Sequence, residues 1–203
     1  RLKQKELGRI PAEVKKSHPN LSLRLHAHEY RLVWRSAANS TDTRTLISTI
    51  LPPNVFLGNS LNFLVPIFFD NSTYVKPISN IESVFLCGIL NSFIQDFIMR
   101  HKVSRNINYF HINGQPIPHF DEENIFHKKI LKNSTMLICT SDEYSKLRDE
   151  VGISEFTTDP SKRLTLEVQI NACAAKIYDL TKEELEYVLE SFPSVGKNIK
   201  DLI

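Results

Sequence analysis

Residues 79–100 read SNIESVFLCGILNSFIQDFIMR, an apolar stretch in the middle of the chain. Its apolar side chains recur at positions 81, 84, 85, 89, 93 and 97, the spacing that places them on one face of a helix. Ser79 or Asn80 can cap the first free backbone N–H groups. The stretch therefore predicts a long core helix against which the rest of the chain packs.

Three segments on either side of this helix predict strands. Residues 29–35 and 61–69 carry β-branched and aromatic side chains, although Pro66 indicates a sheet edge or an irregularity in the second segment. Residues 105–112 alternate polar and apolar side chains, which also predicts a strand.

Helices are expected elsewhere in the chain. Thr41 or Asp42 can cap a short helix over 43–50, which the pair Pro52-Pro53 then stops. From residue 121 onward the pattern is acidic and helical, with Thr181 and Glu184 forming a capping box. These later helices are expected at 121–139, 142–150, 160–178 and 181–191.

The fold class that follows is α+β, with a small mixed sheet and flanking helices followed by a helical C-terminal subregion. Residues 1–20 are interpreted as a linker or a connecting helix from a missing catalytic domain. Residues 21–120 form the α/β core, and residues 121–203 form the helical subregion packed on it.

Composition narrows the class of protein. The chain has 203 residues with 41% hydrophobic content, enough for a substantial core, and no apolar run approaches the roughly 20 residues of a membrane span. We expect a cytoplasmic protein. Cys87, Cys139 and Cys173 lack metal-ligand or disulfide spacing, so we expect buried thiols. Because the chain begins with Arg1, we expect a fragment of a longer protein.

Charge is distributed unevenly. Residues 1–44 hold ten Lys and Arg against four Asp and Glu, whereas residues 121–203 hold eleven against sixteen. A basic end of this kind attracts a phosphate backbone, although a solvated charged surface has the same composition.

Catalytic motifs are missing from the sequence. It has no glycine-rich cofactor turn and no phosphate loop, and Leu51-Pro52-Pro53-Asn54 lacks the polar and aromatic residues that flank the prolines of a base-flipping loop. Glu13-Val14-Lys15 has no preceding Asp to complete a nuclease site. His26 and His28 could hold a metal if they lay on a strand, but no third ligand is evident.

The remaining polar residues suit nucleic acid. Arg and Asn pair with base edges, while Thr and Lys commonly contact phosphates. The alternative is that Arg35 and Arg44 brace Asp42 or backbone carbonyls and that the asparagines only shape turns. The candidate DNA-binding residues are Arg31, Arg35, Asn39, Thr41, Arg44, Lys102, Arg105, Asn106 and Asn108.

These residues lie in segments with a familiar order. Residues 30–53, with YRLVWR, NSTDTRTLI and LPP, resemble the C-terminal specificity region of class-gamma adenine-N6 DNA methyltransferases and type IIG restriction-modification enzymes. Residues 85–92 (FLCGILNS), 108–118 (NYFHINGQPIP) and 174–193 (AAKIYDLTKEELEYVLESFP) resemble further segments of that group in the same order. One departure is Asp179, which stands where the group usually has glycine.

The resemblance implies that this chain is a target-recognition domain. It would read double-stranded DNA and contain neither a catalytic residue nor a cofactor or metal site of its own. The parent enzyme would carry an N-terminal methyltransferase domain that uses S-adenosylmethionine, with or without a fused nuclease. In that group the matched segments mostly frame the fold while variable loops read the bases.

Two other classes of function stay open. The acidic helices could serve a protein-interaction module of a phage-defence complex. A metal-dependent hydrolase using His26, His28 and a carboxylate is the second alternative.

Overall fold

The computed structural model describes residue 16 and residues 24–39, 41–70 and 73–203. The expected connecting segment at 1–20, and with it Glu13-Val14-Lys15, lies outside the described residues except for Lys16. The α+β class is confirmed: small antiparallel sheets are combined with helices that make up 47% of the chain.

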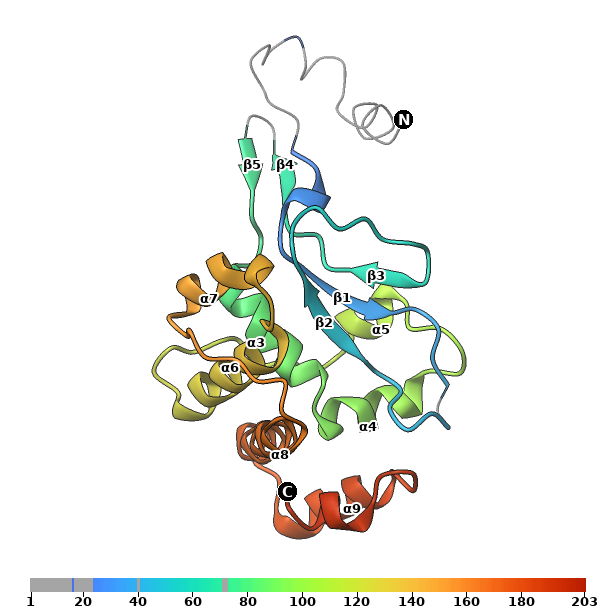
Figure 1. Ribbon diagram of the computed structural model, residues 1–203. Coiled ribbons are helices and arrows are strands. Elements are labelled where there is room, and N and C mark those ends of the chain that lie inside the picture. The colour runs from blue at the N-terminus through green and yellow to red at the C-terminus, as the bar shows by residue number, and fades with distance from the viewer. Residues whose placement is uncertain (1–15, 17–23, 40, 71–72) are drawn as a thin grey trace.

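Two antiparallel sheets contain the described strands (Figure 1). The first has the order β2-β1-β3, and its central strand pairs Trp34 with Ser48 on one side and with Asn62 on the other. The second is a hairpin of β4 and β5. The expected mixed sheet is thus antiparallel throughout the described strands. Their bounds are β1 Arg31–Arg35, β2 Ser48–Leu51, β3 Leu61–Phe63, β4 Phe68–Asp70 and β5 Thr73–Val75.

The helices follow the sheets in the chain and cover one side of the larger sheet (Figure 1). A short 3-10 turn, η1 His26–His28, precedes β1, and η2 Asp142–Tyr144 leads into α7. The described α-helices are α3 Asn80–Leu90, α4 Phe93–Lys102, α5 Tyr109–Asn113, α6 Ile125–Ile138, α7 Ser145–Val151, α8 Pro160–Ile177, α9 Lys182–Glu190 and α10 Lys197–Lys200.

The expected single helix at 79–100 is two helices, α3 and α4, bent by 70° at their junction. Ser79 forms the predicted cap of α3, as part of a capping box with Glu82. The break is stabilised by Ser92, whose side chain accepts from the Gln95 N–H, and by the Asn171 side chain, which accepts from the Phe93 N–H at 2.7 Å. The apolar periodicity continues through the break. The first helix ends there because Ser92 caps a second helix and because Asn171, 78 residues further along the chain, binds the Phe93 N–H.

The predicted helix at 43–50 is wrong, because residues 43–47 form an irregular segment and residues 48–50 belong to β2. The carboxylate of Asp96 accepts hydrogen bonds from the Thr45 and Leu46 N–H groups at 2.9 Å each, and the Asn91 side chain accepts from the Ser48 N–H at 3.0 Å. These long-range acceptors satisfy the backbone donors that a helix would have used.

Two predicted strands also differ. The stretch 61–69 is interrupted around Pro66, which has no N–H to donate, and becomes β3 and β4. Residues 105–112 contain the start of helix α5, because Asn108 caps it and His111 accepts from the Asn108 N–H at 3.0 Å. By contrast, α6 to α9 agree with the predicted helices, including the capping box of Thr181 and Glu184.

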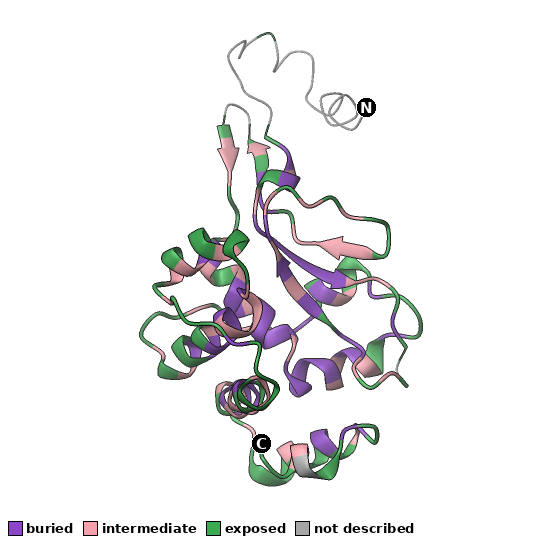
Figure 2. Ribbon diagram, viewed as in Figure 1, coloured by how far each residue is buried: buried purple, intermediate pink, exposed green. Residues whose placement is uncertain are grey.

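The hydrophobic core runs from the larger sheet through α3 into the C-terminal helices (Figure 2). Leu32, Trp34 and Ile50 of the sheet pack in the same cluster as Val84 and Leu90 of α3. On the opposite side of α3, Phe85 and Ile89 join a second cluster with Ile130 of α6 and Ile170 of α8. The helical subregion therefore packs directly on the α/β core.

Protonation of His127 is expected to make the fold less stable in acid. The ring is buried, its Nδ1 accepts from the Asp121 N–H at 3.0 Å, and burial lowers its pKa although nearby Asp121 opposes this effect. The unfolded chain takes up a proton below a pH of about 6.5 while the folded chain resists it, so the free energy of unfolding falls as the pH drops from 7 to 5. Urea titrations across this range should show a shallower fall for His127→Gln, and an unchanged slope would contradict this role.

Candidate nucleic-acid interface

Three segments distant in sequence meet at Ser36, just after the end of β1. The Ser36 N–H donates to the Ser60 carbonyl at 2.9 Å, and the Ser36 carbonyl accepts from the Ile107 N–H at 2.7 Å. The Ala38 N–H donates to the Arg105 carbonyl at 2.9 Å. The loops around 36–39, 59–62 and 104–107 therefore form one continuous surface region, which we call the Ser36 junction.

Side chains from β1 and β3 fix the third of these loops. Asn62 Nδ2 donates to the Ile107 carbonyl at 2.9 Å, and the buried Trp34 indole N–H donates to the same oxygen at 3.3 Å. Ile107 itself is fully buried. Because side chains from both strands donate to the Ile107 carbonyl, the backbone of the residues on either side of Ile107 is held in a fixed position.

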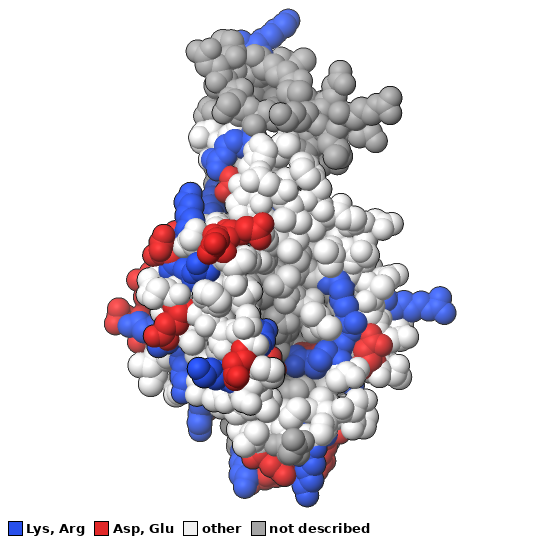
Figure 3. Space-filling model, in the orientation of Figure 1, with Lys and Arg blue, Asp and Glu red and all other residues white. Residues whose placement is uncertain are grey.

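Acidic residues are missing from two long segments that supply this region. Residues 43–69 and 97–120 contain no Asp or Glu, whereas they contain Arg44, Arg100, Lys102 and Arg105. Figure 3 shows that, on the face that it draws, most acidic side chains lie over α6, α7 and α9. The part over β3 is largely white, and lower on the same side blue side chains lie beside one red patch. Segments without carboxylates do not repel phosphates. At the edge of the junction, the Asp42 carboxylate accepts from the Asn39 N–H at 3.1 Å and is paired with Arg35.

Arg35 is engaged inside the protein. Its guanidinium donates to the Asp42 carboxylate at 2.7 Å, to the Thr45 carbonyl at 3.2 Å and to the Arg44 carbonyl. These bonds fold the 41–45 loop back onto the end of β1. The geometry matches the alternative in which this arginine braces Asp42 and backbone carbonyls.

Arg44 has a similar internal set of contacts. Its Nε donates to the fully buried Asp96 carboxylate at 2.6 Å, and its Nη2 donates to the Asn91 carbonyl at 2.5 Å. The guanidinium also lies 4.3 Å from the centre of the Phe93 ring. Arg44 therefore ties the loop to the junction of α3 and α4.

Two further arginines position loops rather than project from them. Arg31 is buried, donates to the Val55 carbonyl and lies over the Phe63 ring at 5.7 Å. Arg100 donates to the Asp42 and Thr43 carbonyls at 2.5 and 3.0 Å. Together with Arg35 and Arg44 they hold the loops that lead to the Ser36 junction.

The other predicted residues lie at the surface. Lys102 donates to the Gly114 carbonyl at 2.9 Å, and Asn108 caps α5. Of the nine candidate residues, four have exposed side chains that make no hydrogen bond or ion pair to the described part of the chain. These are Asn39, Thr41, Arg105 and Asn106. The structure thus brings Asn39, Arg105 and Asn106 together at the Ser36 junction.

Several residues of this surface were missed by sequence reasoning. Ser36, Asn59 and Ser60 form one of its edges, and Asn62 supports it from β3. The run without acidic residues from 43 to 69 was a usable signal, since it covers the loop that contains Asn59 and Ser60. Their position beside residue 106 depends on strand pairing, which a local pattern does not reveal.

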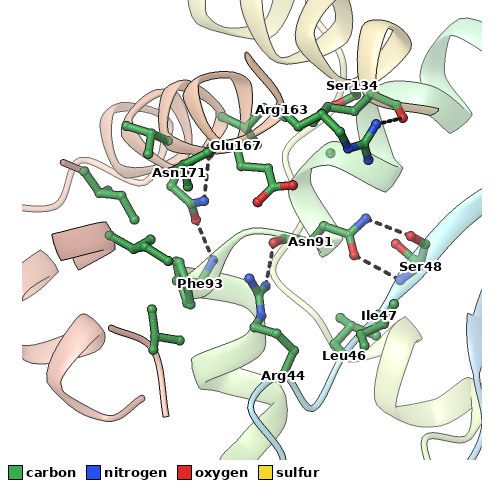
Figure 4. A pocket seen from close by; sticks show the side chains of 18 of the residues that line it. Arg44, Leu46, Ile47, Ser48, Asn91, Phe93, Ser134, Arg163, Glu167 and Asn171 are labelled. Carbon is green, nitrogen blue, oxygen red and sulfur yellow. Dashed lines mark hydrogen bonds between the residues drawn. The ribbon is translucent and has the colours of Figure 1, made fainter. Parts of the chain in front are cut away.

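A hollow of about 450 Å³ lies between the 43–49 segment, the junction of α3 and α4, and α8. Figure 4 shows that several polar side chains around the hollow form hydrogen bonds within the protein. The Asn91 side chain accepts from the Ser48 N–H, the Asn171 side chain accepts from the Phe93 N–H, and Arg163 donates to the Leu137 carbonyl at 2.9 Å. Its polar wall is therefore used mainly to fix the surrounding loops and helices.

The metal hypothesis finds no support in the described residues. His26 and His28 lie on the η1 turn rather than on a strand, and the His26 ring packs edge-on against Phe63 at 5.6 Å. In the part of the chain that the structure describes, no group of three or more His, Cys, Asp or Glu residues could hold a metal ion. The strand geometry on which that hypothesis depended is therefore not present at these histidines.

The cysteines are buried and free, as predicted. Burial raises the pKa of the Cys87 thiol to about 12 and that of Cys139 to about 11, and burial also raises the pKa of Cys173. All three remain protonated thiols near neutral pH, which makes them poor nucleophiles.

No single described helix is long and apolar enough to cross a membrane, although α3 and α4 together meet that criterion by length and composition. Both helices are largely buried within the core (Figure 2).

Comparison of the chain with protein-family models, with curated proteins and with solved structures found no match in any of the three.

Proposed function

We propose that this chain is a DNA-binding target-recognition domain, belonging to an adenine-specific DNA methyltransferase or a combined restriction-modification enzyme. The observation that carries the proposal is the Ser36 junction, where exposed Arg and Asn side chains without protein partners lie beside two chain segments, 43–69 and 97–120, that contain no Asp or Glu. Arg and Asn are the residues best suited to paired hydrogen bonds with guanine and adenine edges.

The proposal gives the candidate residues two roles. Arg105, Asn106 and Asn39 are exposed and available to base edges or phosphates, whereas Arg31, Arg35 and Arg44 hold the loops from inside. This division agrees with the resemblance, in which the conspicuous sequence segments frame the fold and the intervening loops read DNA.

The backbone at Asp179 supports the alignment behind the resemblance. Asp179 follows α8 with a φ of 53°, in the left-handed region that favours glycine. The related segments usually have glycine at this place. Glycine adopts this backbone conformation without strain, so the same turn can form with glycine or with Asp179.

In the parent enzyme, an N-terminal methyltransferase domain would bind S-adenosylmethionine and act on an adenine that this domain selects. The 203-residue chain supplies binding and orientation only. The competing class is a protein-interaction module that uses the acidic α9, from which Tyr187 projects with 67% of its surface exposed.

Salt dependence separates these two classes. Selection of binders from a random duplex pool should enrich a specific sequence, and its affinity should fall steeply between 50 and 200 mM salt, as expected when several phosphates are contacted. A folded chain that binds no duplex at low salt would overturn the proposal and leave the interaction module as the better account.

Replacing Arg105 with Ala should weaken binding to the selected duplex by about 1–3 kcal/mol and relax base preference if its side chain reads a base. The fold should be unaffected, because only the Arg105 carbonyl is bonded to Ala38. Fluorescence anisotropy titrations measure this effect, with Lys128→Ala, an exposed lysine of α6, as the matched control. Equal affinities and preferences for the two variants would remove Arg105 from the interface.

A further inference from the structure

Helix α5 is a short, firmly held platform next to the Ser36 junction. Asn108 caps its start, the buried Ile112 anchors its inner side, and the Tyr109 ring packs edge-on against the Trp34 ring at 5.4 Å. At its end, the Gly114 N–H donates to the Phe110 carbonyl at 3.1 Å. The backbone that carries Phe110 is thus fixed from both ends and from below.

Phe110 points away from this platform. The ring is 67% exposed, and its one ring contact among the described residues is with the neighbouring His111 at 3.9 Å between centroids. Single exposed apolar residues are common on protein surfaces, so exposure alone assigns no role.

The surroundings of Phe110 favour one kind of partner. Arg105 and Asn106 lie one turn before the helix with free side chains, and Lys102 is bonded to the Gly114 carbonyl at the far end of it. No acidic residue occurs between 97 and 120. An aromatic ring on a rigid support, flanked by cations and without carboxylates, suits the π-face of a nucleic-acid base beside its phosphates.

We propose that Phe110 is a wedge residue, which inserts between two neighbouring base pairs of the bound duplex and unstacks that step. This inference rests on the proposed function. When an apolar side chain inserts in this way, unstacking the bases costs free energy. Burial of the apolar surface and closer contact with the bent DNA offset this cost. The fixed α5 backbone removes the need to order the wedge on binding, which lowers the cost further.

A test that needs no knowledge of the recognised sequence compares two duplexes of about 30 base pairs at low salt. One is fully paired, and the other has a central abasic site beside a 2-aminopurine. Because unstacking costs less at the damaged step, the wild-type chain should bind the second duplex about tenfold more tightly. The 2-aminopurine fluorescence should rise on binding, because the kink made by the wedge separates this base from the one stacked neighbour that the abasic site leaves it.

Phe110→Ala should bind the paired duplex within about threefold of wild type, because the contacts of the protein with phosphates stay intact. It should lose most of the preference for the abasic duplex and most of the fluorescence rise, because the wedge is missing. Phe110→Leu, which keeps an apolar side chain, should retain part of both. Tyr187→Ala is the matched control, since this aromatic side chain is equally exposed but lies on the acidic α9.

The outcomes of this experiment distinguish the wedge role of Phe110 from the proposed DNA binding. A Phe110→Ala variant that keeps the full preference and fluorescence rise, like Tyr187→Ala, overturns the wedge and leaves DNA binding standing. A wild-type chain that binds neither duplex overturns both. Circular dichroism establishes that each variant is folded before it is compared.

Discussion

Replacing Asp96 with Ala is expected to lower the free energy of unfolding by about 3–5 kcal/mol, because it breaks a buried ion pair and leaves one partner behind. The Asp96 carboxylate is fully buried, accepts from the Thr45 and Leu46 N–H groups at 2.9 Å, and pairs with Arg44 at 2.6 Å. Its loss leaves two backbone donors and a half-buried guanidinium without this acceptor.

Urea denaturation followed by circular dichroism measures the effect. Asp96→Asn keeps one acceptor oxygen but loses the charge, so we expect it to fall between wild type and Asp96→Ala. Glu122→Ala, at an exposed position, is the control for loss of a carboxylate. If Asp96→Ala were as stable as this control, the contacts of Asp96 would contribute nothing to the fold.

The same variant should also weaken the proposed DNA binding under conditions in which it remains folded. Asp96 binds residues 44–46 through hydrogen bonds and an ion pair with Arg44. Arg35 in turn donates to the Arg44 carbonyl, so the position of the 41–45 loop depends on Asp96. A loosened loop must be ordered on binding, which costs free energy. Affinity should therefore decrease even though Asp96 itself lies too deep to touch a ligand.

Replacing Gly88 with Ala is expected to destabilise the fold by about 1–3 kcal/mol through overpacking. An added Cβ would lie 2.2 Å from the Ser134 Oγ and 2.6 Å from the Ile130 Cγ2, both on α6. Helix propensity alone predicts the opposite sign, since Ala inside a helix is favoured over Gly by roughly 0.5–1 kcal/mol. Close packing of α3 on α6 decides the outcome.

The double variant Gly88→Ala/Ser134→Ala removes the nearer of these clashes and should recover part of the loss, which a double-mutant cycle quantifies. Gly58→Ala is the control, because nothing lies within 4 Å of its added Cβ. A Gly88→Ala variant that is more stable than wild type would show that the two helices separate at little cost.

The candidate site was predictable only in part. Arg105, Asn106 and Asn39 were predicted from residue type, and they remain available at the surface. Arg31, Arg35 and Arg44 have the same chemistry but are committed to internal partners. Arg44 and Asp96 are 52 residues apart, and Arg31 and Val55 are 24 apart, so the sequence near each arginine does not reveal its acceptor.

The sequence by itself determined the α+β class, a core strand at 29–35, observed as β1 at 31–35, and the C-terminal helices α6 to α9. Their signals are local: caps such as Thr181 with Glu184 and apolar residues at helical spacing act within a few residues. Tertiary structure alone decided that 43–50 forms a loop and the start of β2 instead of a helix, that the helix at 79–100 breaks, and that 36–39 lies beside 104–107. The physical reason is that Asp96, Asn171 and Ser36 offer hydrogen-bond partners from distant parts of the chain, and such partners outweigh local preference once the core brings them together.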